Sequence, residues 1–396
     1  MSSFSYFLPA ILALTVAFGG AIALKLHRPA ILGYALAGIV LAFFLPRSSL
    51  ISNIPMLATF AQIEAGILMF WAGMEFRCRR IAELKWLAVV AGVLGTLFSM
   101  ILGVAAAHWL GWQAAQGVFV GAAIALSSTT ILSRLATTPE EMRSTTGKMR
   151  MAVTSVQELV LIPIAMVLSS LKDLGAIFTQ PLGRIALQLG KGTFIVAAVL
   201  VLAVWILPRI GTRSGTGRDR ELYIIGAIAC GFVTAALSQA VGLWLPLAAF
   251  AGGIVTGSFE SAQAVTVRLL PLRNVCLALF LVTVSALVDP YRLIANPWPL
   301  LMVLVLIVVG KTLVWTILLR LLRQPFWTAA AVGIGLTQLS EFSYVVLRAA
   351  YGEGLVAIDF YNASLAALVL TIASSVFLST LLGRRADFEI QQPANS

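Results

Sequence analysis

Two ionisable side chains of opposite sign lie at the centres of long apolar stretches. Glu158 is near the middle of residues 151–171, and Lys311 is near the middle of residues 299–319. An ion at the centre of a membrane helix costs ~2.5–3.5 kcal/mol on insertion scales, so each should face protein, water or a partner. A chain that keeps both is expected to handle charge inside a membrane.

Glu158 is the strongest candidate for a site that binds either a proton or a cation. A carboxylate supplies the oxygen ligands that hard cations prefer, and Gln157 adds a neutral amide beside it. Pro163 has no N–H, so the carbonyl of Leu159 loses its helical partner and is available as a further oxygen ligand. The alternative is a protonated carboxyl that only forms a hydrogen bond to a neighbouring helix.

Lys311 follows Gly310, and the sequence allows two compatible roles for it. In a structural role, its ammonium pairs with Glu158 or caps the end of a broken helix. In the second role, it releases or exchanges a proton of its own. If the two charges pair, removing either partner leaves a lone buried ion, at a cost of ~3–5 kcal/mol.

Polar runs interrupt the middle of two other apolar stretches. One run ends in Glu341, at residues 337–341. The other supplies four consecutive hydroxyls, from Ser127, Ser128, Thr129 and Thr130. A single such hydroxyl usually bonds the carbonyl one turn back, but four together predict an unwound segment that faces a cavity. Polar breaks at matched places in two halves of a membrane protein indicate a site at mid-depth.

Two further acids have open roles. Glu341 is expected to neutralise the N-terminus of a half-helix, with a second proton site as the alternative. Glu64 lies in the outer half of residues 56–76. It either lines a path by which ions reach the interior or forms a hydrogen bond inside the helix bundle.

Composition places these residues in a polytopic membrane protein. The 396 residues are 60% hydrophobic and 11% charged, and the mean hydropathy is +0.97, which no soluble protein of this size shows. The sequence has no phosphate-binding glycine loop and no metalloprotease or hydrolase motif. We therefore expect no enzyme, no cofactor, no metal beyond a transported cation and no use of ATP.

Thirteen apolar ranges are each about long enough to cross a ~30 Å hydrocarbon core. They are 4–24, 30–46, 56–76, 84–109, 114–136, 149–171, 185–208, 222–241, 244–258, 271–288, 298–319, 327–350 and 360–383. The seventh range stands between two sets of six, and the second set starts from the opposite side of the membrane. This 6+1+6 layout predicts an inverted repeat joined by a linker helix.

The basic residues predict how the chain is oriented. Of the 27 Lys and Arg, 20 fall in the loops after odd-numbered ranges, six on the opposite side, and Lys311 inside a range. The positive-inside rule then puts the N-terminus outside and the C-terminus in the cytoplasm. The net charge of +11 thus reflects topology and lipid head groups, and we expect no nucleic acid as a partner.

Seven segments together resemble the monovalent cation:proton antiporters of the second family, which include Kef-type potassium efflux systems and NapA-type sodium antiporters. They are HRPAILGYALAGIVL, EAGILMFWAGMEF, ALSSTTILSRL, VQELVLIP, AAFAGGIVTG, LPLRNVCLALF and LTQLSEFSYVV. Glu158 stands in the ion-binding segment of that family, and Glu341 at its acidic position. Lys311 falls where the family carries a lysine opposite the ion-binding carboxylates.

The resemblance implies a NapA-like fold with crossed discontinuous helices, in a homodimer within a bacterial-type cytoplasmic membrane. Residues 1–77 and 209–289 would form a dimerisation scaffold. Residues 78–171 and 290–385 would form an ion-translocating core, with 172–208 as linker helix and 386–396 as cytoplasmic tail. Glu158, Gln157, Ser128, Thr129 and Thr130 would bind the cation or proton, supported by Ser127 and Glu341.

The function implied is exchange of K⁺ or Na⁺ for H⁺ by alternating access, one for one because Gln157 is neutral. Two alternatives stay open, a gated potassium channel on the same fold and a transport-inactive membrane sensor or partner. Three features depart from the family pattern. The ion-site acid is Glu158 where Asp is usual, no glycine lies near Ser285, and no nucleotide domain follows the last range in this chain.

Overall fold

Helices form all the secondary structure that the described residues contain. The structure is a computed structural model that describes residues 3–44, 47–76, 86–129, 131–132, 144–169, 182–201, 219–240, 242–258 and 262–390. Each of the thirteen predicted ranges overlaps a helix within these limits. The all-helical fold is therefore confirmed for the described residues.

By length and composition, six helices among the described residues can cross a membrane. They are Phe7–Lys25, Pro55–Glu75, Trp86–Trp109, Thr145–Leu168, Trp298–Leu321 and Ile358–Ser375. Seven apolar helices are shorter: Ala30–Phe44, Gln116–Ala125, Ala186–Val199, Ile228–Ala240, Leu245–Gly257, Leu270–Ala286 and Phe326–Gly335. The count of thirteen spans therefore stays a prediction.

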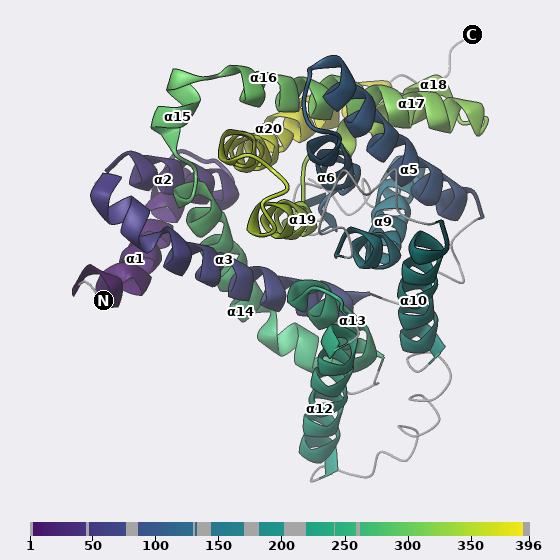
Figure 1. The fold of residues 1–396 in the computed structure, drawn as a ribbon, viewed down its shortest axis with the longest axis horizontal. Helices are drawn as coiled ribbons and strands as arrows, with labels where there is room; N and C mark the ends of the chain where they lie inside the picture. The colour runs from purple at the N-terminus through teal and green to yellow at the C-terminus, as the bar shows by residue number, and fades with distance from the viewer. Residues whose placement is uncertain are drawn as a thin grey trace.

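One group of helices is built on the contacts of α3 with α13 and α14 (Figure 1). Its members are α1 (Ser3–Lys25), α2 (Ala30–Phe44), α3 (Arg47–Glu75), α12 (Asp219–Ala240), α13 (Leu245–Gly257) and α14 (Ala262–Ala286). The backbones of α3 and α13 approach each other closely. A Cβ built on Gly73 would meet the Phe250 carbonyl oxygen at 2.2 Å, and one on Gly253 would lie beside Gly73 Cα at 3.0 Å. Both positions need glycine because backbone, not side chain, fills the space.

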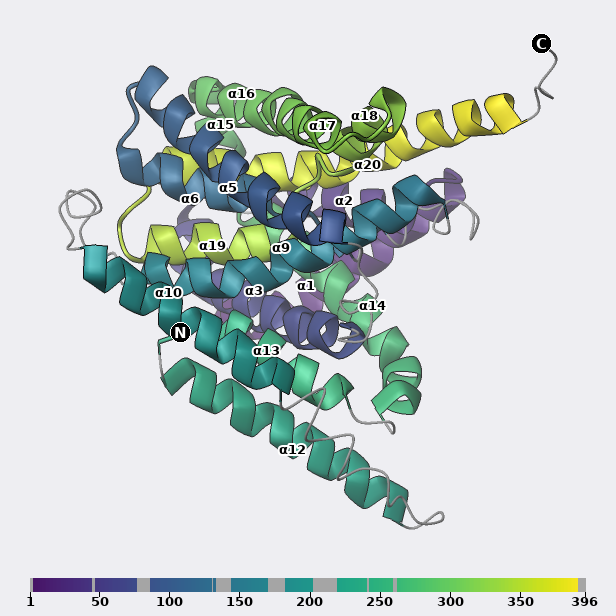
Figure 2. The ribbon, with the colours of Figure 1, turned by 90° about the vertical axis from the view of Figure 1, so that its right-hand side faces the viewer.

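A second group contains the interrupted helices and lies beside the first (Figure 1). Its members are α5 (Trp86–Trp109), α6 (Ala114–Ala125), α9 (Thr145–Ser169), α16 (Trp298–Val305), α17 (Thr312–Leu321), α18 (Phe326–Gly335), α19 (Glu341–Gly352) and α20 (Ile358–Ile390). Figure 2 shows α16, α17 and α18 at the end of the molecule opposite α12.

One long helix and one short helix join the groups. The helix α10 (Leu182–Val201) contacts both α9 and α13. The helix α15 (Pro290–Ala295) leads from α14 to α16. Asp289 caps its start by accepting hydrogen bonds from Tyr291 N at 3.0 Å and Arg292 N at 3.2 Å, and proline follows at the first helical position, which suits a residue without an N–H.

Two helices break where the sequence predicts polar interruptions. Residues 126–128 are not helical, and helical geometry resumes at Thr129, while residues 336–340 separate α18 from α19. The start of α19 has a capping box, in which the Ser340 hydroxyl accepts from Ser343 N at 3.3 Å and Ser340 N donates to the Ser343 hydroxyl at 3.1 Å. Thr130 lies outside the described residues.

Two details differ from the sequence predictions. The range 298–319 contains a π-helix, η3 (Leu306–Lys311), between α16 and α17. The helix of the tenth range, α14, begins at Ala262 in place of residue 271, so Arg273 lies well inside it and not near its start. Arg273 is buried there because its guanidinium pairs with Glu75 at 2.7 Å.

Candidate ion-binding site

Glu158 lies on α9 beside the point where the first interrupted helix resumes. Its side chain is 4% exposed, and its Oε1 accepts a hydrogen bond from the Thr129 hydroxyl at 2.9 Å. The N-terminal end of a helical segment carries partial positive charge, which favours an anion or an oxygen ligand of a cation site close by. The structure thus brings Glu158 and Thr129, two of the predicted ligands, into direct contact.

The neighbouring amide of Gln157 holds the backbone of the break. Its Oε1 accepts from Ser127 N at 3.2 Å, and its side chain is fully buried. The Nε2 atom has no hydrogen-bond partner among the described residues. Gln157 therefore supports the unwound segment in this conformation, with its oxygen already used.

Lys311 caps the end of α6. Its Nζ donates to the carbonyl oxygen of Leu126 at 2.9 Å, and the side chain is fully buried. The C-terminal end of a helix carries partial negative charge and unpaired carbonyls, so an ammonium is favourable at this point. The ion pairs formed by the described residues do not include one between Lys311 and Glu158. Of the two structural roles foreseen, the geometry matches capping.

The two breaks are bonded to each other. The Ser127 hydroxyl donates to the Leu336 carbonyl at 2.9 Å, and the Ser128 hydroxyl donates to Glu341 Oε2 at 3.0 Å. Glu341 is the first residue of α19 and is 2% exposed, so its carboxylate lies at a half-helix N-terminus, as expected from the sequence.

Two further side chains fasten the crossing, and the sequence reasoning did not single them out. Gln338 Nε2 donates to the Ser128 carbonyl at 3.3 Å, and the Ser343 hydroxyl donates to the Ala123 carbonyl at 2.8 Å. Ser343 stands three residues after Ser340, the spacing typical of a helix cap. That spacing was the available signal for it.

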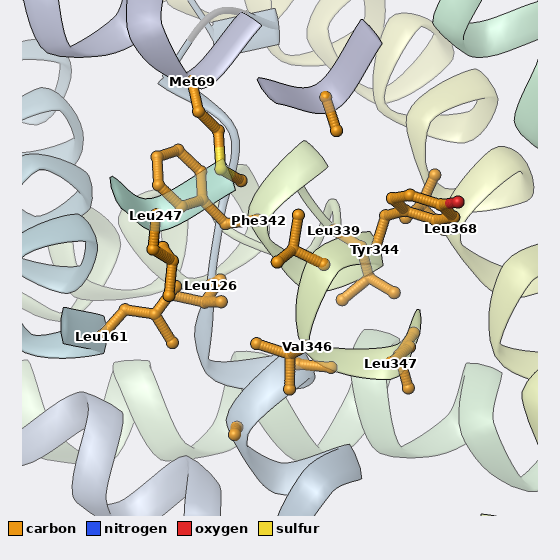
Figure 3. Packing of buried hydrophobic residues seen from close by; sticks show 14 of the residues in the cluster. Met69, Leu126, Leu161, Leu247, Leu339, Phe342, Tyr344, Val346, Leu347 and Leu368 are labelled. Atoms are coloured by element: carbon orange, nitrogen blue, oxygen red, sulfur yellow. The ribbon is translucent and has the colours of Figure 1, made fainter. Parts of the chain in front are cut away.

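Apolar side chains separate the crossing from the first group of helices. Figure 3 shows Met69 of α3 and Leu247 of α13 beside Phe342 of α19. Phe250 of α13 contacts Phe342 edge-to-face, with ring centroids 5.3 Å apart. The two rings offer no hydrogen-bonding groups to an ion, so this contact opposes the passage of ions while it is packed.

Two other acids, Glu341 and Glu75, lie within electrostatic range of Glu158. Glu75 is 39% exposed at its side chain and is held by Arg273 at 2.7 Å and by Trp71 Nε1 at 3.3 Å. Glu64, by contrast, accepts from the Thr283 hydroxyl at 3.2 Å and does not join the crossing. The path suggested for Glu64 from the sequence stays a prediction.

The donor set at the crossing suits one small charge. Around Glu158 the described residues supply one carboxylate and one hydroxyl. They contain no cluster of three or more His, Cys, Asp or Glu side chains that could hold a metal ion. Such a site can hold a proton or a cation between oxygen atoms, but it offers no resident metal centre in the described part of the chain.

Comparisons with known proteins agree with this architecture. The chain is 28% identical over 93% of its length to the iron transporter MagA of Paramagnetospirillum magneticum. It is 26% identical over 92% to the putative cation/proton antiporter YbaL of Escherichia coli, and 27% identical over 90% to K(+) efflux antiporter 4 of Arabidopsis thaliana. The matched regions span 83%, 66% and 60% of those three relatives.

A solved structure shows the same fold. The sodium proton antiporter MjNhaP1 from Methanocaldococcus jannaschii superposes with a TM-score of 0.64, covering 94% of this chain and 96% of that one at 16% identity. The family model described as "Sodium/hydrogen exchanger, transmembrane" matches residues 11–383. The family resemblance is thereby confirmed, and this chain belongs to the sodium/hydrogen exchanger family of multi-pass membrane transporters, which are not enzymes, with Kef-type monovalent cation:proton antiporters among its relatives.

Proposed function

We propose that this protein exchanges a monovalent cation, K⁺ or Na⁺, for H⁺, with Glu158 as the group that the two ions occupy in turn. The observation that carries the proposal is the buried contact between Glu158 and Thr129 at the break of a helix, 2.9 Å long. The helix ends around it are already neutralised by Lys311 and Glu341. The carboxylate of Glu158 is therefore left for the transported ion.

We infer alternating access as the way in which the site changes sides. Loaded with a cation or a proton, Glu158 is neutral and can cross an apolar barrier, whereas the empty carboxylate carries a charge that makes crossing costly. The first group of helices would act as the scaffold and the second as the moving core. The apolar contact of Phe250 with Phe342 supports this division because it carries few polar bonds that motion would break.

The packing of the first group supports an inverted repeat of two sets of six helices. In that repeat, α2 corresponds to α13 and α3 to α14. The helix α3 packs against α13, and α2 packs against α14, as a two-fold axis in the membrane plane would require. Thirteen spans, an outside N-terminus, a cytoplasmic C-terminus and a homodimer in a cytoplasmic membrane complete the proposal.

The charge of the site favours a monovalent cargo. MagA is named an iron transporter and the plant relative a K⁺ efflux antiporter, so the names of the relatives alone do not decide which cation is transported. A single carboxylate at Glu158 exactly balances one positive charge, whereas Fe²⁺ would leave one charge uncompensated in a buried site. Fe²⁺ ions also favour nitrogen or carboxylate clusters, which the described residues do not supply.

The test is exchange in proteoliposomes that contain a pH-sensitive dye. Addition of K⁺ or Na⁺ should change the internal pH for the wild type, and Glu158→Gln should reduce the change to that of empty liposomes. Glu353→Gln is the matched control, because Glu353 is an exposed acid at the end of α19. Exchange by Glu158→Gln at the wild-type rate would refute the mechanism.

Two further arms separate the alternatives. A channel would move the cation without protons, so its pH signal would appear only when an uncoupler lets protons follow. Fe²⁺ in place of K⁺ should give no exchange. Coupled transport of Fe²⁺ but not of K⁺ or Na⁺ would contradict the monovalent cargo.

A further inference from the structure

Glu64 is a buried acid that the proposed exchange does not use. It lies on α3 with 7% of its surface exposed. Its Oε1 accepts from the Thr283 hydroxyl of α14 at 3.2 Å, and its Oε2 has no hydrogen-bond partner among the described residues. A buried carboxylate needs several donors or a cation to offset the loss of water, and one neutral hydroxyl does not provide this.

The described residues that face Glu64 offer no positive charge. The ion pairs that the described residues form do not involve it. The helices packed against α3 are α13, α14 and α19. From α14 the Cys276 thiol lies within electrostatic range, and from α19 the Tyr344 phenol, while α13 contains no ionisable residue.

Tyr344 extends this cluster across the contact between the two helix groups. Its hydroxyl donates to the Ala58 carbonyl of α3 at 3.5 Å, and its ring meets Phe280 of α14 edge-to-face at 5.5 Å. Both groups are thus in contact around Glu64. The cluster is separate from the crossing, because the acids that act on Glu158 are Glu341 and Glu75.

We propose that Glu64 is a second proton-binding site, and that the proton bound there stabilises the contact of α3 and α14 with α19. The neutral acid suits an apolar contact with one hydroxyl donor, and its own O–H removes the need for a counter-ion. The effect of this proton on transport rests on the proposed division into scaffold and core. The proton site itself does not depend on that division.

The effect on transport has a definite sign. Parting of the two helix groups admits water to Glu64, and water stabilises the ionised acid. High pH therefore favours parting in the wild type. The side chain of Glu64→Gln stays neutral at every pH, so high pH does not favour parting in this variant. The ratio of its exchange rate to the wild-type rate should therefore be near one at low pH and fall as pH rises.

Infrared difference spectroscopy of the purified protein tests the proton directly. We expect a protonated-carboxyl C=O band near neutral pH that shifts in D₂O, is absent in Glu64→Gln and persists in Glu158→Gln. Thr283→Val keeps the shape of the side chain but removes the donor, so it should move the band to higher frequency. Glu353→Gln, which changes an exposed acid, should leave the band in place.

Two outcomes would overturn the inference. One is a spectrum in which no carboxyl band responds to Glu64→Gln or to Thr283→Val. The other is a Glu64→Gln rate that differs from wild type by the same factor at every pH, as a purely structural role would give. Loss of exchange in Glu158→Gln bears on the proposed function alone, so the two proposals can fail separately.

Discussion

At the scale of single residues, the two central charges bind different partners and not each other. Lys311 donates to the Leu126 carbonyl at 2.9 Å, and Glu158 accepts from the Thr129 hydroxyl at 2.9 Å. Both contacts lie within four residues of chain, across the break at 126–128. The break therefore keeps the positive and negative groups at opposite helix ends, where each is favoured.

We expect Lys311→Gln to keep coupled exchange at a lower rate. The amide of glutamine can still donate to the Leu126 carbonyl, so the cap survives without its charge, at a cost of about 1–3 kcal/mol for a weakened buried hydrogen bond. Exchange by the wild type and by the variant should be equally insensitive to an imposed membrane potential. With Na⁺ as the cargo, valinomycin and a K⁺ gradient set that potential.

Lys191→Met is the control for this variant, because Lys191 lies exposed on α10. A wild type whose rate follows the membrane potential, with that dependence lost in Lys311→Gln, would show that Lys311 carries a proton of its own. That result would replace one-for-one exchange by an electrogenic cycle.

At the scale of elements, glycine contacts set how α3 and α13 lie together. Gly73→Ala should lower the apparent melting temperature, because its methyl would meet the Phe250 carbonyl oxygen at 2.2 Å. Overpacking of this kind costs about 1–3 kcal/mol. Thermal unfolding in detergent, followed by tryptophan fluorescence, measures the shift.

Gly66→Ala is the matched control on the same helix. A Cβ at Gly66 would find nothing within 4 Å, and alanine favours a helix over glycine by about 1 kcal/mol. Its melting temperature should equal or exceed that of wild type. A Gly73→Ala protein as stable as Gly66→Ala would mean that the two helices do not approach as closely as described.

The interruptions of α6 and α18 show how far sequence reasoning reaches. The four consecutive hydroxyls from Ser127 to Thr130, and the polar run at residues 337–341, predicted both breaks, because Ser and Thr hydroxyls compete with helical hydrogen bonds. The π-helix η3 was not predicted. Its sequence, LIVVGK, belongs to a long apolar stretch and carries no signal that tells a π-helix from an α-helix.

Partners distant in sequence were equally hidden. Glu75 pairs with Arg273, 198 residues away, and Glu64 meets Thr283, 219 residues away. Composition and hydropathy carry no information about which helices adjoin, so neither pair could be predicted from the sequence. The family resemblance predicted roles for Glu158 and Glu341, whereas the partners of Glu75 and Glu64 appear only in the packing of α3 with α14.

At the scale of the whole molecule, cation and proton should compete in stability as well as in transport. A ligand that binds only the folded protein stabilises it by about 2.7 kcal/mol at about 100 times its Kd. K⁺ or Na⁺ should therefore raise the melting temperature at alkaline pH. The gain should shrink as pH falls, because a proton on Glu158 excludes the cation.

Choline chloride at equal ionic strength serves as the salt control for this measurement, and Glu158→Gln as the protein control. Neither should show ion-specific stabilisation. Stabilisation of Glu158→Gln by the same cation and to the same degree would locate the binding site elsewhere in the molecule.

The π-helix that ends at Lys311 has a consequence for the number of residues in this segment. Its hydrogen bonds join residues five apart, where an α-helix joins residues four apart. Residues 306–311 thus accommodate one amino acid more than a regular helix would. Deleting one residue there would restore an unbroken ladder and leave α16 and α17 facing as they do now, while withdrawing the ammonium from its carbonyl. The extra residue is what lets a membrane helix present a lysine without turning its neighbours.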